Sequence, residues 1–362
     1  MVGDNLSILV LGASYGLILG LKASFCGHKV TFVCRPREID LINLGKAAVQ
    51  IPSKHNAQVI ELRADASPER PRAIEPQIVD PDDYDFCILA MQEPQYSSAE
   101  VIELIAKISE ANVPVLSITN MPLPPLFSGP LQLDLNEISE VWHNADMWSA
   151  VDSTRFSAAS PDPQAMMVGD TQDLLLRVNH PTNIKAAPFA NERAQEILQK
   201  LATSIDELRV FFNGEQHQIG VRLIGHHHPL VSMAKWPMLI TGNFRCWSSS
   251  GIVSIADAVH ADPQISAEIY EWVSLLCQKL CAAADVRDVP LVPFERYAEA
   301  AHSLTLPSSL ARGLSNGVLR VERVDKLMQK LAMSFDMQNA SLDSIVSQVD
   351  FALAENKSNL VG

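Results

Sequence analysis

A short glycine turn follows the first apolar run of the chain. The sequence Gly12-Ala13-Ser14-Tyr15-Gly16 separates that run from a helical pattern. Glycines at such a turn let the backbone approach a pyrophosphate, and the helix N-terminus supplies N–H donors and the positive end of its dipole. Ser14 stands where the dinucleotide-binding pattern has its middle glycine. We predict that these five residues bind a dinucleotide; the alternative is a turn that binds nothing.

An arginine stands at the end of the second apolar run, where NAD enzymes usually carry an acid. Residues 29–34 read KVTFVC and lead into Arg35-Pro36-Arg37. An acid at this point binds the ribose 2′-hydroxyl of NAD, whereas an arginine accommodates the 2′-phosphate of NADP. We therefore predict NADP as the cofactor, with Arg35 on the 2′-phosphate and Arg37 as a helper. Glu38 falls inside the next helix and is given no role; the alternative for Arg35 is a solvated surface position.

The elements that must position these residues follow a strand–helix–strand order. Strands are expected at 7–11 and 29–34 around a helix at 17–25, which together form a parallel βαβ unit. Further strands at 86–91 and 113–118 flank a helix at 97–111. Between these elements the sequence predicts a short helix at 39–45, strands within 49–62 and a loop at 64–76. After them it predicts no regular structure at 121–130, one helix within 131–163, strands at 174–178 and 208–212, and a helix at 191–203.

After residue 213 the strand patterns largely stop and helical periods begin. Helices are expected at 232–245, 263–284, 294–302, 318–334 and 341–354. The predicted fold is therefore α/β, with an N-terminal Rossmann domain built on a parallel sheet and an all-α C-terminal domain. We expect the NADP-binding domain to span 1–213 and a helical domain for substrate binding and dimerisation to span 214–362.

Composition excludes several classes of partner. The 362 residues carry a net charge of −14, which repels nucleic acid and anionic membrane surfaces. No apolar stretch is long enough to span a membrane, and no signal peptide is expected, so the protein is predicted to be cytoplasmic. Six cysteines lie mostly within apolar runs and are expected to be buried thiols. The consecutive histidines 226–228 cannot all face one ion, so no metal site is expected.

Several stretches together resemble the ketopantoate reductase (2-dehydropantoate 2-reductase) family. In the first part of the chain the matching stretches are the glycine turn, the run from Gly27 to Arg35, and residues 86–92 and 115–120. In the second part they are Ala234-Lys235, Asn243, and the segments 307–309 and 324–327. The resemblance implies a Rossmann domain followed by a helical domain like that of 6-phosphogluconate dehydrogenase. It implies an NADP-dependent reduction of a small 2-keto acid in the cleft between them.

The resemblance also implies roles for single residues. Lys235 matches the family lysine that acts as general acid on the keto oxygen, where a positioned ammonium stabilises developing charge. Asn243 and Ser309 match residues that bind the substrate, and the family glutamate falls at Glu322 or, with a shift of one residue, at Arg323. Asn120 matches an asparagine near the nicotinamide ribose. Three positions differ from the family: Gln92 replaces a lysine near the cofactor, Leu239 an asparagine and Met121 a glycine.

Two alternatives differ in chemistry. His228-Pro229 ahead of a helix resembles the opine dehydrogenases, in which a histidine serves as acid and base in the reductive amination of a keto acid. His228 would take that role with a carboxylate such as Asp257, unless the histidines form only an inter-domain turn. The second alternative is a non-catalytic relative that binds a nucleotide or a protein partner. The expected partners are a small keto acid and, by analogy, a second copy of the chain.

Overall fold

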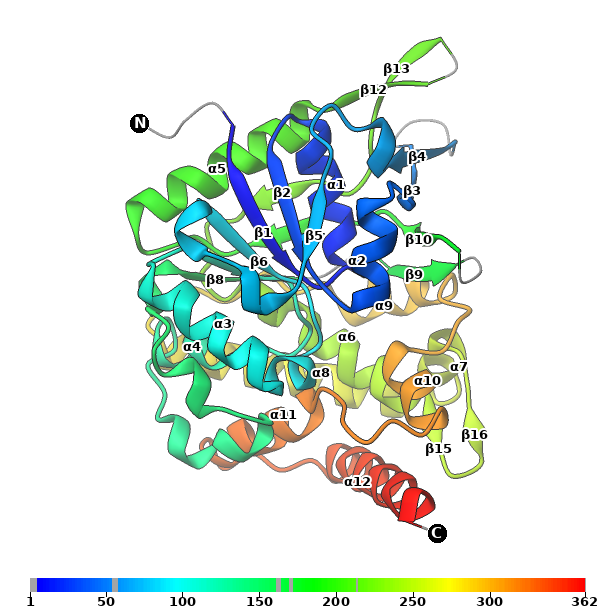
Figure 1. Cartoon of the computed structure of the whole chain (residues 1–362). Coiled ribbons are helices and arrows are strands. Elements are labelled where there is room, and N and C mark those ends of the chain that lie inside the picture. The colour runs from blue at the N-terminus through cyan, green and yellow to red at the C-terminus, as the bar shows by residue number, and fades with distance from the viewer. Residues whose placement is uncertain (1–4, 54–57, 161–163, 169–171, 213, 362) are drawn as a thin grey trace.

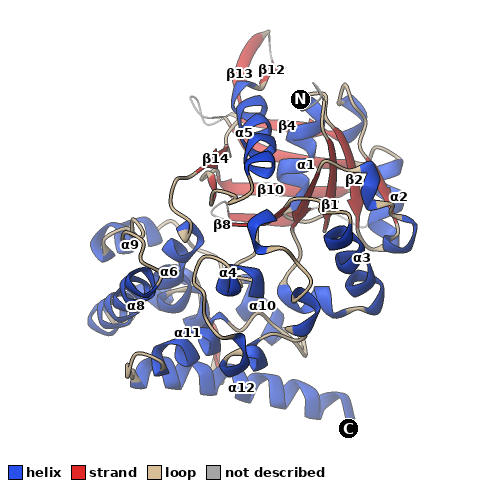
Figure 2. Cartoon of the chain, turned by 90° about the vertical axis from the view of Figure 1, so that its left-hand side faces the viewer, coloured by secondary structure: helices blue, strands red, loops and turns tan. Residues whose placement is uncertain are grey.

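The chain forms a large sheet with helices on both faces, followed by a group of helices packed below it (Figure 1). The computed structural model describes residues 5–53, 58–160, 164–168, 172–212 and 214–361. Figure 2 shows the strands gathered in the upper part of the molecule and the C-terminal helices beneath them. The predicted fold class is confirmed.

The main sheet has eight strands in the order β14-β11-β8-β7-β6-β1-β2-β5. Its strands are β1 (Ser7–Leu11), β2 (Lys29–Val33), β5 (Arg72–Ile74), β6 (Phe86–Leu89), β7 (Val115–Ser117), β8 (Phe156–Ser160), β11 (Ile184–Ala186) and β14 (Leu223–Gly225). The six strands from β5 to β8 are parallel and follow the order 3-2-1-4-5-6 of a Rossmann sheet. In that order a ligand binds beyond the carboxyl ends of the strands, where β1 and β6 lie side by side.

Alternate residues of the central strand face two separate cores. Ile8 and Val10 pack with α1 (Gly16–Phe25) and α5 (Glu192–Glu207), while Leu9 and Leu11 face α3 (Ala99–Glu110). The second core continues without a break into the C-terminal helices. Strands covered on both faces must be apolar throughout, so the apolar runs SILVL and FCIL indicated buried strands.

The C-terminal helices pack against one face of a long helix, α8 (Pro263–Ala283). Asp262 caps its first turn, and Pro263 occupies the first helical position, where no N–H is needed. The neighbouring elements are η9 (Val231–Lys235), α6 (Trp236–Thr241), η10 (Asn243–Arg245), α7 (Ile255–His260), α9 (Phe294–Ala301), α10 (Ser309–Ser315), α11 (Val324–Met333) and α12 (Ala340–Val361). None of the helices described is long and apolar enough to cross a membrane.

Several local predictions were wrong. The expected loop at 64–76 contains β5, an edge strand of the main sheet, and the proline-rich stretch 121–130 contains α4 (Pro124–Ser128), whose prolines sit at its first turn. Instead of one helix, 131–160 forms short 3-10 turns and then β8. The helix expected at 232–245 is divided into η9, α6 and η10, because Pro237 can sit only at a helix start.

Strands also continue beyond residue 213. The hairpin β12 (Arg209–Phe212) and β13 (Glu215–Gln218) stands apart from the main sheet, whereas β14 belongs to it. A second sheet, missed as a unit, has the order β4-β3-β10-β9 and joins β3 (Ala47–Pro52) and β4 (Val59–Arg63) to β9 (Gln164–Val168) and β10 (Leu174–His180). The predicted division at residue 213 stays a prediction, but the last strand of the main sheet lies beyond it.

Candidate active site

A continuous cleft lies between the carboxyl ends of the Rossmann strands and the C-terminal helices. On the sheet side it is lined by Ser14, Ala90, Met91, Gln92 and Thr119, and on the helical side by residues such as Lys235, Met238, Asn243 and Ser308. The two sides share Tyr15, Asn120, Ala165, Met166, Ser309 and Arg312 as common lining residues. This is the place where a Rossmann sheet binds its dinucleotide, so the site is where the topology requires it.

The glycines of the turn allow the backbone to pack closely against neighbouring strands. Gly12 has φ +104°, and a Cβ there would lie 2.9 Å from the carbonyl oxygen of Ala90. A Cβ on Gly16 would lie 2.6 Å from Val10, so this glycine lets α1 pack directly on β1. Of the five predicted residues, Ser14 and Tyr15 line the cleft, while the side chain of Ala13 is buried in the core.

Arg35 follows β2 and pairs with the carboxylate of Glu38. Its backbone N–H donates to Glu38 Oε2 at 3.0 Å, and its Nε donates to Oε1 at 3.1 Å. The Arg35 side chain is 80% exposed, whereas that of Glu38 is 12% exposed. Glu38 therefore caps α2 (Pro36–Asn43) and holds the guanidinium, a contact that the sequence did not indicate.

Asn120 and Gln92 follow two neighbouring strands of the sheet. Gln92 comes after β6 and is exposed, with its backbone N–H donating to Gln95 Oε1. Asn120 comes after β7, and its side chain hydrogen-bonds the carboxylate of Glu322. Both line the cleft, as expected for residues beyond the carboxyl ends of β6 and β7.

Glu322 reaches the cleft from the loop before α11. Its Oε1 accepts a hydrogen bond from the backbone N–H of Glu93 at 3.3 Å, and the backbone of Met121 also bonds it. Burial raises the pKa of this carboxyl to about 7, although the hydrogen bonds oppose that shift. Of the two predicted positions for the family glutamate, the structure brings Glu322 to the cleft. Arg323 is instead buried and paired with Asp325 and Asp350.

Lys235 lies at the junction of η9 and α6 and lines the helical side of the cleft. The side chain is partly buried, and burial lowers the pKa of its ammonium to about 8. A lysine with this pKa is still largely protonated at neutral pH and gives up its proton more easily than a solvated one. Its placement fits a general acid.

Ser308 links the two segments that carry Asn243 and Ser309. Ser308 Oγ donates to the backbone carbonyl of Asn243 at 2.7 Å and accepts from the N–H of Ala311, which caps α10. This ties η10 to the start of α10, so both predicted substrate residues line the same hollow as Lys235.

Arg312 was missed in the sequence and lines both sides of the cleft. It is partly buried and donates one hydrogen bond to the carbonyl of Pro307. A signal was available, because Arg312 is three residues after Ser309 and so lies on the same face of a helix.

Tyr15, assigned only to the cofactor, also lines both sides of the cleft, and burial raises the pKa of its hydroxyl.

The histidine run does not reach the cleft. His228 Nε2 lies 2.6 Å from the carbonyl oxygen of Arg287, and its Nδ1 accepts from the N–H of Leu230. Asp257, its proposed partner, sits in the first turn of α7 and hydrogen-bonds Ser254. His228 thus fixes a loop by bonds from both ring nitrogens, and the opine-type acid–base role has no support in this geometry. In the part of the chain described, no cluster of His, Cys, Asp and Glu suits a metal, and all six cysteines are free.

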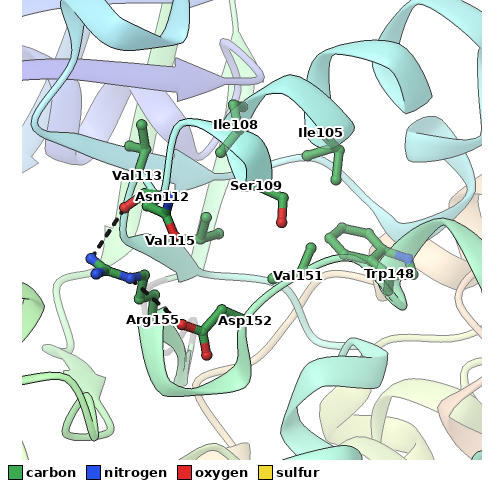
Figure 3. Close-up of a pocket in the computed structure, with 10 residues that line it drawn as sticks. All are labelled: Ile105, Ile108, Ser109, Asn112, Val113, Val115, Trp148, Val151, Asp152 and Arg155. Atoms are coloured by element: carbon green, nitrogen blue, oxygen red, sulfur yellow. Dashed lines mark hydrogen bonds and ion pairs between the residues drawn. The ribbon is translucent and has the colours of Figure 1, made fainter.

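A second hollow, lined by none of these residues, lies between α3 and the segment before β8 (Figure 3). Its wall is apolar, with Ile105, Ile108 and Trp148 facing inwards, and an ion pair between Arg155 and Asp152 at its edge. The free volume is about 10 Å³, which holds about one water molecule. It is a packing defect rather than a ligand site.

Comparison with solved structures identifies the architecture. A ketopantoate reductase of the PanE/ApbA family from Ralstonia eutropha JMP134 superposes with a TM-score of 0.66 at 13% identity, covering 97% of this chain and 100% of that one. A putative ketopantoate reductase from Ralstonia solanacearum MolK2 gives 0.67 at 13% identity, with 98% and 99% covered. The chain has the two-domain fold of ketopantoate reductase.

The same fold also carries other keto acid chemistry. A D-mandelate dehydrogenase, solved with NADH and anilino(oxo)acetate, superposes with a TM-score of 0.61 at 13% identity, covering 97% of this chain and all of that one. No family model matches the sequence, and no curated protein matches it. The ketopantoate reductase fold is thus retained here although most side chains differ.

Proposed function

We propose that this protein is an NADP-dependent reductase that converts a 2-keto acid into the 2-hydroxy acid. The observation that carries the proposal is the convergence of Lys235, Asn243, Ser309 and Glu322 on one cleft with the glycine turn. These residues come from four separate segments. The neighbouring structures of the same fold include ketopantoate reductases and a D-mandelate dehydrogenase, whose names describe keto acid chemistry.

The residues at the carboxyl ends of the Rossmann strands fit a dinucleotide. The turn after β1 leads into the N-terminus of a ten-residue helix that has no acid in its first turn, so nothing there repels a pyrophosphate. Ser14 is exposed in the cleft and adds a hydroxyl donor. NADPH bound here supplies the hydride. Arg35 and Arg37, at the tip of β2, favour the 2′-phosphate of NADP, provided that the phosphate draws Arg35 away from Glu38.

Lys235 supplies the proton that the reduction requires. As hydride reaches the keto carbon, negative charge develops on the oxygen, and the ammonium stabilises and then protonates it. The keto acid, NADPH and one proton thereby become the hydroxy acid and NADP⁺. Asn243 and Ser309 orient the substrate beside the lysine. Glu322 acts as a positioning residue, because its carboxylate holds the Asn120 side chain at the cofactor side of the cleft.

The helical part is proposed to mediate pairing of two chains. A dimeric ketopantoate reductase from Staphylococcus aureus is among the structures with this fold, at a TM-score of 0.56. Light scattering on a size-exclusion column is expected to give about twice the chain mass of 39.7 kDa. A mass of one chain at micromolar concentration contradicts the pairing.

A panel of 2-keto acids, each tested with NADPH and NADH, examines the function. We expect NADPH oxidation with at least one acid, faster than with NADH, and equal rates with and without added amino acids. A strict requirement for an amine points to the opine-type reaction instead. Absence of NADPH binding at millimolar concentration overturns the enzymatic proposal and leaves a non-catalytic relative.

A further inference from the structure

Arg312 is a charged group that the proposed mechanism leaves unused. It is partly buried at the point where the cofactor and substrate sides of the cleft meet, and it forms no ion pair within the part of the chain that the structure describes. Two other arginines that are buried or partly buried have a carboxylate or a hydroxyl as partner. Arg323 pairs with two aspartates, and Arg245 donates to the hydroxyl of Ser266. A partly buried guanidinium without a carboxylate partner is free to bind the carboxylate of a ligand.

No acid of the cleft competes for this guanidinium. Glu322 lines the same region, but its carboxylate is already bonded by the backbone of Glu93 and by Asn120. Among the described residues, Arg312 itself donates one N–H, to the carbonyl of Pro307. Its remaining donors form a planar fork, whose geometry matches the two oxygens of a carboxylate.

Arg312 and Lys235 line the same hollow, so both can contact one substrate there. Asn243 and Ser309 also line it. In a 2-keto acid the carboxylate and the keto carbon are directly bonded. An arginine on the carboxylate and a lysine on the keto oxygen therefore fix the carbon that receives hydride.

Part of the wall of this hollow is apolar. It consists of Met238, Leu239, Ile255, Tyr297, Leu304 and Leu306. Leu306 lines the hollow and is 45% exposed. Its backbone carbonyl accepts a hydrogen bond from the N–H of Ile255, which fixes the segment that carries Leu306. The Tyr297 hydroxyl donates to the carbonyl of Met238 at 3.2 Å, which leaves the ring itself as lining.

Gly242 lets this wall assemble. A Cβ at this position would lie 2.3 Å from the Tyr297 hydroxyl and 3.0 Å from Ile255 Cγ2. The glycine at the end of α6 therefore allows two of the apolar side chains to pack against the helix that begins beside Lys235. The polar lining of the same hollow includes Gln164 of β9 and Asn179 of β10.

We propose that Arg312 binds the substrate carboxylate and that the wall formed by Leu239, Ile255, Tyr297 and Leu306 receives an apolar substrate side chain. The substrate class is then a 2-keto acid with a branched aliphatic or aromatic side chain. This inference rests on the reductase function proposed above. It adds a binding residue and a specificity that a general keto acid reductase does not require.

Steady-state kinetics on four acids test the inference. The probes are 4-methyl-2-oxopentanoate and phenylpyruvate as apolar substrates, pyruvate as the small one and 2-oxoglutarate as the charged one. We expect kcat/KM to be at least about 10-fold higher for an apolar acid than for pyruvate, because each buried methylene contributes about 10-fold or more. Leu239→Asn is expected to reduce that preference.

The arginine is tested by Arg312→Met and Arg312→Lys, with Arg296→Gln as the matched control. Arg296 is an exposed arginine of α9 outside the cleft lining, so its loss changes the net charge equally. Losing a charge-assisted hydrogen bond to the carboxylate should raise KM by roughly 10- to 100-fold in Arg312→Met. Arg312→Lys should recover part of that loss, and the control should match the parent. NADPH affinity, measured by fluorescence, should change less than about 3-fold in all three.

Failure of this inference is distinguishable from failure of the proposed function. If the parent protein reduces none of the acids although NADPH binds, the reductase function itself is contradicted. If reduction occurs but 2-oxoglutarate or pyruvate is preferred, the apolar wall is not the specificity site. If Arg312→Met weakens NADPH binding and leaves KM unchanged, the arginine contacts the cofactor and its assignment to the substrate is wrong. A thermal melt of each variant separates these outcomes from misfolding.

Discussion

The Oε1 atom of Glu322 lies 3.3 Å from the backbone nitrogen of Glu93 and accepts its hydrogen bond. The first residue precedes α11 in the helical part, and the second follows β6 in the Rossmann sheet. Glu93 is itself buried, and its own carboxylate accepts from the backbone and the ring of His143. A chain of polar contacts thus joins the two parts of the molecule directly beside the cleft.

The pH dependence of stability should report on the Glu322 carboxyl. Its pKa is raised from 4.5 to about 7, so between these values the folded state holds a proton that the unfolded state has released. Stability therefore falls as pH rises from about 4.5 to about 7, by at most about 3 kcal/mol. Glu322→Gln should remove this component in urea denaturation at pH 5 and pH 8.

Glu110→Gln provides the control, because Glu110 is an exposed carboxyl at the end of α3. Its profile should follow that of the parent protein at every pH. A Glu322→Gln variant with an unchanged slope between pH 5 and pH 7 means that this carboxyl is ionised in the folded state and contradicts its raised pKa.

Lys235→Met should lower turnover strongly and leave cofactor binding intact. Loss of a positioned general acid costs about 10²–10⁴-fold in kcat. Since the ammonium has a pKa of about 8, the protonated form needed for reduction is lost above that value, and kcat/KM of the parent should fall as pH rises past 8. Lys357→Met, at an exposed position on α12, should behave as the parent. Equal losses in kcat and in NADPH affinity argue against the assigned role.

The pair Arg35 and Glu38 should set the preference between the two dinucleotides. Arg35→Gln removes the fork that we propose binds the 2′-phosphate, so NADPH affinity is expected to fall by about 10-fold or more while NADH affinity changes little. Glu38→Gln keeps an acceptor for the Arg35 backbone N–H but frees the guanidinium from its carboxylate. This variant should bind NADPH more tightly. A parent protein that prefers NADH, with Glu38→Gln reversing that preference, would mean that Glu38 reads the ribose instead.

The Rossmann half was predictable because its constraints are local. The runs at β1, β2 and β6 are apolar on both faces, and Gly12 and Gly16 mark the turn that only a residue without a side chain can make. Short strands gave a weaker signal. β5 has three residues, and β14 follows a hairpin outside the main sheet, so neither carries a recognisable period.

The candidate site was only partly predictable, since its members meet through tertiary contacts. Lys235 and Asn243 were found by resemblance, but nothing local indicates that Asn120 and Glu322 bond each other across 202 residues. Arg312 was overlooked because a lone arginine in a helix is usually solvated. Its meaning depends on the absence of a carboxylate around it in the described part of the chain, which only three-dimensional packing reveals.

A buried lysine far from the cleft should control the stability of the Rossmann half. Lys22 of α1 has no exposed surface, and its Nζ donates to the carbonyls of Gly220, at 2.6 Å, and of Val221. Val221 has φ +62°, a strained conformation for a β-branched residue, so the lysine fixes backbone that would otherwise relax. Lys22→Met leaves both carbonyls without this donor and should cost roughly 2–4 kcal/mol.

The same lysine gives the stability a second dependence on pH. Burial lowers its pKa from 10.5 to about 7, so above pH 7 the unfolded state binds a proton that the folded state lacks. Stability therefore rises with pH from about 7 towards 10.5, and Lys22→Met should lose that rise. Urea midpoints at pH 7 and pH 9 measure the difference, with Lys29→Met at an exposed position of β2 as the control. If the parent shows no rise although Lys22→Met is destabilised, the ammonium stays charged on its two carbonyls, and hydrogen bonding outweighs the cost of burying it.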